Sequence, residues 1–105
     1  MTLRKKTSLS KVKRCDELRG IPLLKAMEIL GLYVKIDPDY SPKKNPFSKR
    51  FFICVEERNF EIVIVDQKFF DVKARKGGGG SIDLVKHLYS ESFIKAFDRL
   101  NEVFP

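Results

Sequence analysis

The chain has 105 residues, of which 43% are hydrophobic and 33% are charged, and its formal net charge is +7. These values favour one compact domain and exclude both a disordered chain and two domains with separate cores. No stretch approaches the ~18 consecutive apolar residues of a membrane span, and no apolar segment of a secretory signal follows the basic N-terminus, so we expect a cytoplasmic protein that contacts no membrane.

The positive charge is concentrated at the N-terminus. Residues 1–14 hold six Lys or Arg side chains and no acid, which leaves a net charge of only +1 on the rest of the chain. Residues 1–19 have few apolar side chains and no sustained period, so we predict a flexible basic arm there and a single domain over residues 20–105. Such arms contact the phosphate backbone of nucleic acids, but a solvated leader without a ligand has the same composition.

The domain is expected to begin with a helix and a loop. Apolar residues recur at helical spacing between Ile21 and Leu30, and Gly31 follows in the position of a left-handed cap, which predicts a helix. Three prolines then predict a loop over residues 37–48. This loop and its exit carry a second positive cluster: Lys43, Lys44, Lys49 and Arg50.

Three short strands are expected next. Residues 51–55, 60–65 and 69–73 are rich in aromatic and β-branched side chains, and the polar breaks between them have the length of hairpin loops. Short links favour antiparallel neighbours, so these segments predict a three-stranded meander. Its packed face is expected to contain Phe51, Ile53, Ile62, Ile64, Phe70 and Val72.

Four consecutive glycines are the most unusual local feature: Gly77, Gly78, Gly79 and Gly80. They lack Cβ atoms and lead into a predicted helix with Ser81 as its N-cap, so their backbone N–H groups could cradle a phosphate. Lys73, Arg75 and Lys76 lie just upstream and would add positive charge. A nucleotide P-loop is excluded, because no Lys-Ser/Thr pair follows the last glycine. The same run also fits a linker that binds nothing.

Two helices are expected to complete the chain, one beginning at Ser81 and one after Ser92, each with an apolar stripe. The predicted fold is therefore α+β, a small three-stranded antiparallel sheet with one N-terminal and two C-terminal helices packed on one face. His87 follows Asp83 by one helical turn, so the two side chains could hydrogen-bond. Without a nucleophile beside them, they predict no catalytic site.

The cysteines, the histidine and the loop aromatics bear on metal and stacking sites. Cys15, Cys54 and His87 are fewer than the four ligands of a closed zinc site, so we expect reduced thiols, no metal and no cofactor. Tyr40 and Phe47 in the loop are candidate platforms for the bases of a single strand. Phe69 is a third candidate, although core packing is the ordinary role of a strand phenylalanine.

One part of the chain resembles a known family. The stretch KFFDVKARKGGGGSIDLVKHLYSESFIKAFDRL is similar to the end of the Cys-His-Cys-Cys zinc-finger domain of bacterial DnaG-type primases. It is more similar still to the zinc-less versions in plasmid and mobile-element primase-like and mobilisation proteins. The shared features are an aromatic–aromatic–Asp strand, a glycine-rich turn, an Ile-Asp-Leu/Phe-Val segment and a Ser-Phe that starts the last helix. The segment IPLLKAMEILGL also resembles the opening helix of the family.

The sequence departs from this family at the zinc ligands. Its second ligand pair, C-x-x-C, falls on Val72 and Arg75, which cannot bind zinc. Cys54 and Glu57 have the spacing of the first pair, but one thiol makes no site. The resemblance therefore implies a zinc-ribbon-like fold in which apolar packing replaces the metal.

The resemblance implies a non-catalytic DNA-binding module, expected to bind single-stranded DNA with little sequence preference, in the replication, priming or mobilisation of a plasmid or mobile element. No segment matches the catalytic Toprim domain of primases, so no enzymatic activity is expected. The residues expected to hold DNA are the loop cluster with Tyr40, the three bases upstream of the glycines, and the glycine run with Ser81. The alternative is a protein-interaction subunit that docks on a polymerase, relaxase or helicase.

Overall fold

The computed structural model describes the backbone of residues 2–105 and the side-chain surroundings of residues 10–105. Within this part of the chain there are four helices and five strands. The helices are α1 (Thr2–Arg19), α2 (Leu23–Ile29), α3 (Ser81–Tyr89) and α4 (Phe93–Val103). The strands are β1 (Tyr33–Ile36), β2 (Lys49–Val55), β3 (Arg58–Val65), β4 (Lys68–Asp71) and β5 (Lys76–Gly79). No helix over residues 2–105 is long and apolar enough to cross a membrane.

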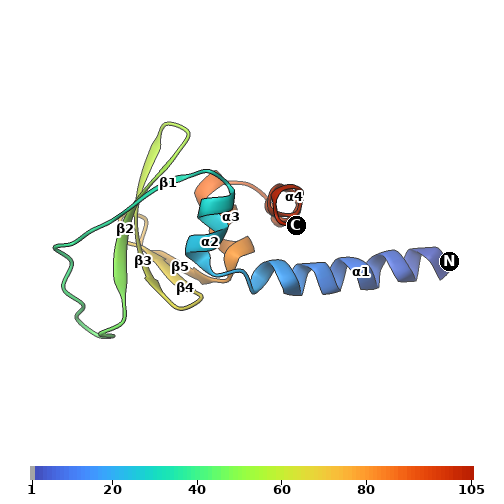
Figure 1. The fold of residues 1–105 in the computed structure, drawn as a ribbon, viewed down its shortest axis with the longest axis horizontal. Coiled ribbons are helices and arrows are strands. Elements are labelled where there is room, and N and C mark those ends of the chain that lie inside the picture. Colours follow the sequence, from blue (N-terminus) through green and yellow to red (C-terminus); the bar gives the residue numbers. More distant parts are fainter. Residues whose placement is uncertain (1) are drawn as a thin grey trace.

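The strands form one antiparallel sheet in the order β1-β2-β3-β4-β5. Helices α2 and α3 cover one face of this sheet, and α1 and α4 lie beyond them, so that the other face of the sheet has no helix against it (Figure 1). The sheet lies at one end of a molecule that is 55 Å long. We call the face without helices the outer face.

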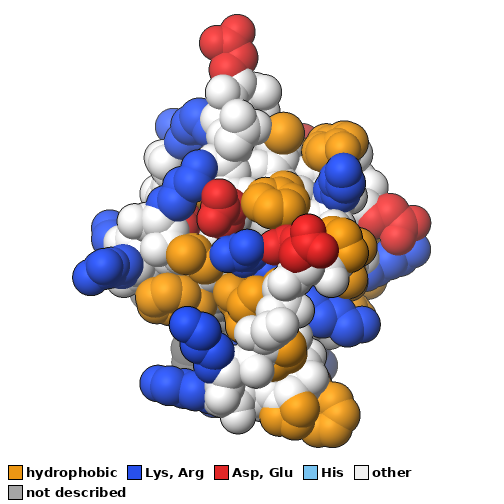
Figure 2. All heavy atoms as spheres, turned by 90° about the vertical axis from the view of Figure 1, so that its left-hand side faces the viewer, with side chains coloured by type: hydrophobic (Ala, Val, Ile, Leu, Met, Phe, Trp, Pro, Cys, Tyr) orange, Lys and Arg blue, Asp and Glu red, His pale blue; other side chains and the backbone are white. Residues whose placement is uncertain are grey.

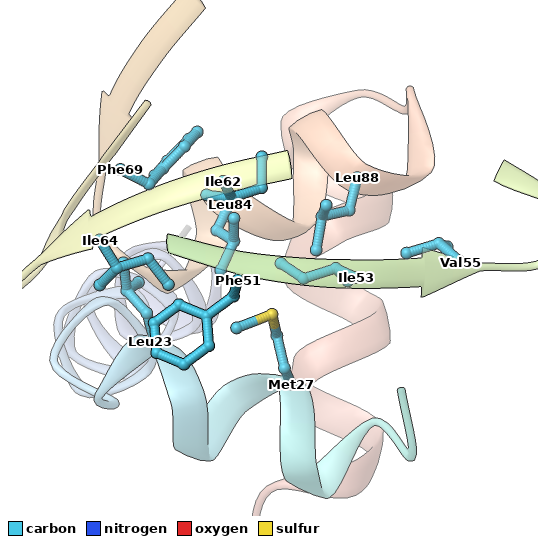
Figure 3. Close-up of a cluster of buried hydrophobic side chains, with 10 residues drawn as sticks. All are labelled: Leu23, Met27, Phe51, Ile53, Val55, Ile62, Ile64, Phe69, Leu84 and Leu88. Atoms are coloured by element: carbon cyan, nitrogen blue, oxygen red, sulfur yellow. The ribbon is translucent and has the colours of Figure 1, made fainter. Parts of the chain in front are cut away.

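Two apolar clusters hold these layers together. The first joins the sheet to α2 and α3, and its side chains point toward one another in Figure 3. It consists of Leu23, Met27, Phe51, Ile53, Val55, Ile62, Ile64, Phe69, Leu84 and Leu88. The second joins α2 and α3 to α1 and α4, and it consists of Leu18, Ile21, Ala26, Ile82, Val85, Ala96, Phe97 and Leu100. Each large side chain buried in this way contributes about 1.5–3 kcal/mol, so the two clusters account for the layering.

The expected three-stranded sheet with three helices is wrong. The segments expected at 51–55, 60–65 and 69–73 correspond to β2, β3 and β4, but an additional strand lies at each edge of the sheet. Strand β1 is only four residues long, and β5 contains three of the four glycines, a residue type with low strand propensity. Pairing with a neighbouring strand, rather than local propensity, makes both segments extended.

The N-terminal segment also differs from the expected flexible arm, because it forms α1. No apolar stripe runs along this helix, which is why helical periodicity did not reveal it. The helix packs on the domain near its C-terminal end, where Leu18 is fully buried and Cys15 is half-buried. Arg14 ties it to α4 by donating to Asn101 Oδ1 at 2.6 Å and to the Phe104 carbonyl at 2.5 Å. The side chains of Arg4, Lys5 and Lys6, on which the expected basic arm partly rests, lie outside the described set.

The face of β4 is the reverse of the expected one. Phe69 pairs in register with Ile64 and is buried, whereas Phe70 is 45% exposed on the outer face. Val72, also expected in the core, is half-buried and lines the outer face. Because side chains alternate along a strand, an error of one residue in the register exchanges the two faces.

Candidate functional site

The outer face presents a mixture of apolar, aromatic and basic side chains. Alternation along the central strands places Arg50, Phe52 and Cys54 of β2 on this face, together with Glu61, Val63 and Val65 of β3 and Lys68 and Phe70 of β4. Figure 2 views this side of the molecule and shows hydrophobic side chains interleaved with Lys and Arg, with a few acids among them. The solvated face of an antiparallel sheet ordinarily carries mostly polar residues. Aromatic and aliphatic side chains on such a face indicate a binding surface.

The proline-rich loop folds over this face and forms a groove with it. The groove has a volume of about 630 Å³, and its walls come from the loop on one side and from β2, β3 and β4 on the other. Its lining includes Tyr40, Lys43, Lys44, Arg50, Val63 and Phe70. The groove thus brings together four of the predicted site residues: Tyr40, Lys43, Lys44 and Arg50.

Asp37 and Arg50 fix the base of the loop. The Asp37 carboxylate is buried and accepts hydrogen bonds from Arg50 Nε at 2.9 Å and Arg50 Nη2 at 2.6 Å. The Asp37 amide donates to the Arg50 carbonyl at 2.8 Å. Hydrogen bonding to the Arg50 guanidinium holds the pKa of Asp37 below its usual value. Farther along, the Tyr40 and Ser48 hydroxyls lie 3.3 Å apart, and Ser48 Oγ donates to the Asn45 carbonyl.

Arg50 also contacts two aromatic rings, Tyr40 in the groove and Phe52 beside it on the outer face. Its guanidinium lies 5.6 Å from the centre of the Tyr40 ring and 5.9 Å from that of Phe52, within the range of a cation–π contact. Arg50 Nη1 lies 4.0 Å from Glu61 Oε2. With two carboxylates beside it, Arg50 holds the loop and the aromatic rings in place rather than offering a free charge. Lys43 and Lys44 are exposed and form no ion pair among the described residues.

A second basic segment is the turn between β4 and β5, residues 72–75, together with Lys76, which we call the basic turn. Lys73 lies toward the outer face, because its Nζ is 3.8 Å from Glu61 Oε1. Arg75 is exposed and has a left-handed backbone with φ of 55°. The structure therefore joins the basic turn to the outer face through Lys73, while Lys76 lines a separate cleft on the helix side of the sheet.

The glycine run does not form the expected cradle in a loop. Gly78 lies against the Phe69 ring, since a Cβ atom at this position would be 2.7 Å from a ring carbon. The Gly79 amide donates to Asp83 Oδ2 at 3.3 Å, and the Gly80 amide donates to the Gln67 carbonyl at 2.7 Å. The Gly79 and Gly80 amides are thus engaged by the protein itself, Gly77, Gly78 and Gly79 pair with β4 in the sheet, and an internal carboxylate lies where the phosphate was expected. Gly77 remains on the exposed edge of the sheet.

Two other predicted site residues lie outside the groove. Ser81 is fully buried and its hydroxyl donates to the Leu18 carbonyl, so it cannot reach a ligand, and Gly80 is the N-cap of α3 in its place. Lys49 precedes the buried Phe51 by two residues and lines a hollow on the helix side with Leu24. Of the candidate stacking residues, Phe69 is buried in the core and Phe47 is 80% exposed away from the groove lining.

Sequence reasoning missed Phe70 and Phe52 as site residues. The pair Phe69–Phe70 offers one aromatic side chain to each face of the sheet, and nothing local decides which of the two is buried. The register of β4 against β3 decides it. Phe52 lies between the buried Phe51 and Ile53, so strict alternation was the signal that could have placed it on the outer face.

Among the side chains that the structure describes, residues 10–105, no three His, Cys, Asp or Glu lie together in a way that could hold a metal ion. Cys15 and Cys54 are free thiols, and both are half-buried. Cys54 Sγ lies 2.9 Å from Asn59 Oδ1.

The chain is similar to a 65 kDa protein of Zymomonas mobilis subsp. mobilis, with 34% identity over 93 residues. That alignment covers 88% of this chain but only 14% of the length of the relative. No family model matches the chain, and no solved structure matches it.

Proposed function

We propose that this chain is a non-catalytic module that binds single-stranded DNA across the outer face of its sheet. The observation that carries the proposal is the groove in which Tyr40 and the exposed Phe70 lie beside Lys43 and Lys44. Aromatic rings offer stacking surfaces to unpaired bases, and lysines beside them contact the phosphates that link those bases. A duplex hides the faces of its bases, so it would leave the rings in this groove unused.

The charges around the groove are compatible with a polyanion. One acid, Asp39, lines the groove, and it forms no ion pair among the described residues. Two further acids near the groove, Asp37 and Glu61, lie beside Arg50, and Glu61 also lies beside Lys73. The negative charges of Asp37 and Glu61 are therefore offset within the protein, and the two rim lysines, Lys43 and Lys44, outnumber Asp39 in the groove. Because stacking and phosphate contacts read no base edges, we expect little sequence preference.

The biological setting of this proposal comes from the resemblance alone. A module of this kind would hold a template strand for a larger protein in the replication, priming or mobilisation of a plasmid or mobile element, in the cytoplasm. The similarity to one short part of a much longer relative is in keeping with a module of a larger assembly.

The test is charge reversal at the rim of the groove. We expect the double variant Lys43→Glu/Lys44→Glu to bind a labelled single-stranded oligonucleotide about tenfold or more weakly than the wild type, because it removes two phosphate contacts and adds repulsion. Affinity is measured by fluorescence anisotropy at about 50 and about 200 mM salt, and the wild-type affinity is expected to fall steeply between the two.

The matched control is Lys25→Glu/Lys95→Glu, which changes the net charge equally at exposed positions on the helices. Under the proposal it retains most of the wild-type affinity. Equal losses for the two double variants would mean that binding responds only to net charge, and the groove would not be the site. If Lys43→Glu/Lys44→Glu kept the wild-type affinity, the groove would be excluded as the binding site.

A further inference from the structure

A buried carboxylate shapes the basic turn. Asp71 ends β4 on the helix side of the sheet and is only 4% exposed. Its Oδ1 accepts hydrogen bonds from the amides of Lys73 and Ala74, each at 3.0 Å. Its carbonyl accepts a third bond from the Arg75 amide at 2.8 Å. These bonds determine the path of the backbone that carries Lys73 and Arg75.

The second oxygen of this carboxylate is held from α3. His87 Nε2 lies 2.6 Å from Asp71 Oδ2. Burial by itself raises the pKa of Asp71, but the hydrogen bonds from Ala74, His87 and Lys73 outweigh it, so the pKa is below its usual value and the carboxylate is ionised. The imidazole therefore donates this bond. Sequence spacing suggested Asp83 as the partner of His87, but Asp83 faces the Gly79 amide instead.

Aromatic neighbours fix the orientation of the imidazole. The rings of Phe60 and Phe69 each have their centres 5.9 Å from that of His87, at interplanar angles of 63° and 40°. His87 thus reaches Asp71 from a helix that is itself anchored in both apolar clusters. This makes a rigid connection from the core of the molecule to the turn.

The turn requires such a connection. Arg75 adopts a left-handed backbone that residues with a Cβ atom disfavour, and three cations stand within four residues of one another: Lys73, Arg75 and Lys76. The left-handed backbone of Arg75 and the repulsion between the three cations both favour other conformations of the turn. The hydrogen bonds of Asp71, itself held by His87, stabilise the observed conformation.

From this geometry we propose that His87 is a positioning residue for phosphate binding. Acting through Asp71, it holds the basic turn in the conformation that brings Lys73 to the outer face and leaves Arg75 exposed, while Lys76 lies on the helix side. This inference rests on the proposed function, because it has the basic turn contact phosphates of the same strand that binds in the groove. His87 itself touches no ligand.

The test compares His87→Ala with His87→Gln in two measurements. Glutamine can still donate one hydrogen bond to Asp71, whereas alanine cannot. In the first measurement, nuclear magnetic resonance of the free protein, we expect the Lys73 and Ala74 amide signals to shift or broaden in His87→Ala and to stay close to the wild type in His87→Gln. In the second, single-strand affinity is measured at several salt concentrations. We expect the salt slope of His87→Ala to be shallower by about 0.7 to 1.4, the contribution of one or two phosphate contacts with a single strand.

Val85→Ala is the control for lost stability. Val85 lies on the same helix, is fully buried and belongs to the second apolar cluster, away from the turn. It is expected to lower stability while leaving the amide signals and the salt slope unchanged. The positioning role would be overturned if the amide signals and the salt slope of His87→Ala matched those of the wild type. It would also be overturned if the salt slope of Val85→Ala were as shallow as that of His87→Ala. If the wild type binds no single strand at low salt, the proposed function fails, while the amide signals still decide whether His87 holds the turn.

Discussion

Two acidic side chains organise the basic segments of this protein. Asp37 fixes the start of the proline-rich loop through Arg50, and Asp71 fixes the basic turn through its amides and His87. In both places a carboxylate is removed from solvent and surrounded by donors. Each arrangement stabilises the ionised form and thereby lowers the pKa, with consequences for folding at acid pH.

Stability is expected to depend on Asp71 in a definite pH window. The pKa of Asp71 is lower in the folded protein than in the unfolded chain, so its stabilising contribution is fully present above the unfolded value of about 3.9 and is lost as pH falls through the folded value. We expect Asp71→Asn to be less stable than the wild type at about pH 7 and to lose less further stability between about pH 5 and about pH 2.

Urea unfolding of both proteins across this range provides the measurement. Some acid sensitivity will remain in the variant, because the pKa values of Asp37 and Glu91 are also lowered. Two stability curves that run parallel over the whole range would show that Asp71 contributes nothing through its charge.

At the scale of the elements, β5 is a strand that depends on the absence of side chains. A Cβ atom at Gly78 would lie 2.7 Å from the Phe69 ring and 2.9 Å from the Asp83 carboxylate. At Gly79 the nearest atom would be the Gln67 carbonyl oxygen at 3.6 Å, an ordinary contact. The two neighbouring glycines therefore differ in what they tolerate, although they belong to the same strand.

We expect Gly78→Ala to be destabilised by about 1–3 kcal/mol, because the aromatic ring and the strand must move apart. Gly79→Ala serves as its partner and is expected to change stability by less than about 1 kcal/mol. Thermal unfolding distinguishes them, since 1 kcal/mol corresponds to about 4–8 °C in Tm for a domain of this size. Equal Tm values would show that β5 is not packed against Phe69 as the structure has it.

The same elements show how far the sequence predicts this fold. Helix α2 and strands β2, β3 and β4 follow from apolar periodicity and β-branched content, because burial alone determines them. Strand β5 and the face of β4 do not, because they depend on register and on contacts with Phe69. Helix α1 lacks the apolar stripe on which a helix prediction relies.

The candidate site was predicted only in part for the same reason. Local composition identified Tyr40, Lys43 and Lys44 in the loop and Arg50 at the start of β2. Phe70 and the Asp71–His87 pair required knowledge of which strands and helices face each other. Ser81 satisfied every local criterion of an N-cap, yet its hydroxyl is engaged by Leu18 of α1, a contact between residues far apart in the sequence.

For the whole molecule, function is expected to be divided between its two sides. The helices cover one face of the sheet (Figure 1), and they bury both apolar clusters. The outer face (Figure 2) carries the groove and connects with the basic turn through Lys73. A strand of nucleic acid on that face would meet aromatic rings at its centre and cations at its margins. The claim on which this account depends is that bases stack within the groove.

Fluorescence tests this claim directly, because the chain contains no tryptophan. Phe70→Trp places a single indole in the groove, and Phe93→Trp places one on α4, on the helix side of the molecule, as a control. Each variant is titrated with a single-stranded oligonucleotide at about 50 mM salt, and the salt concentration is then raised to about 200 mM. We predict quenching of the indole at position 70 that high salt reverses, with little change at position 93. The account would be contradicted if anisotropy of the labelled strand showed saturable binding while the emission at position 70 stayed unchanged.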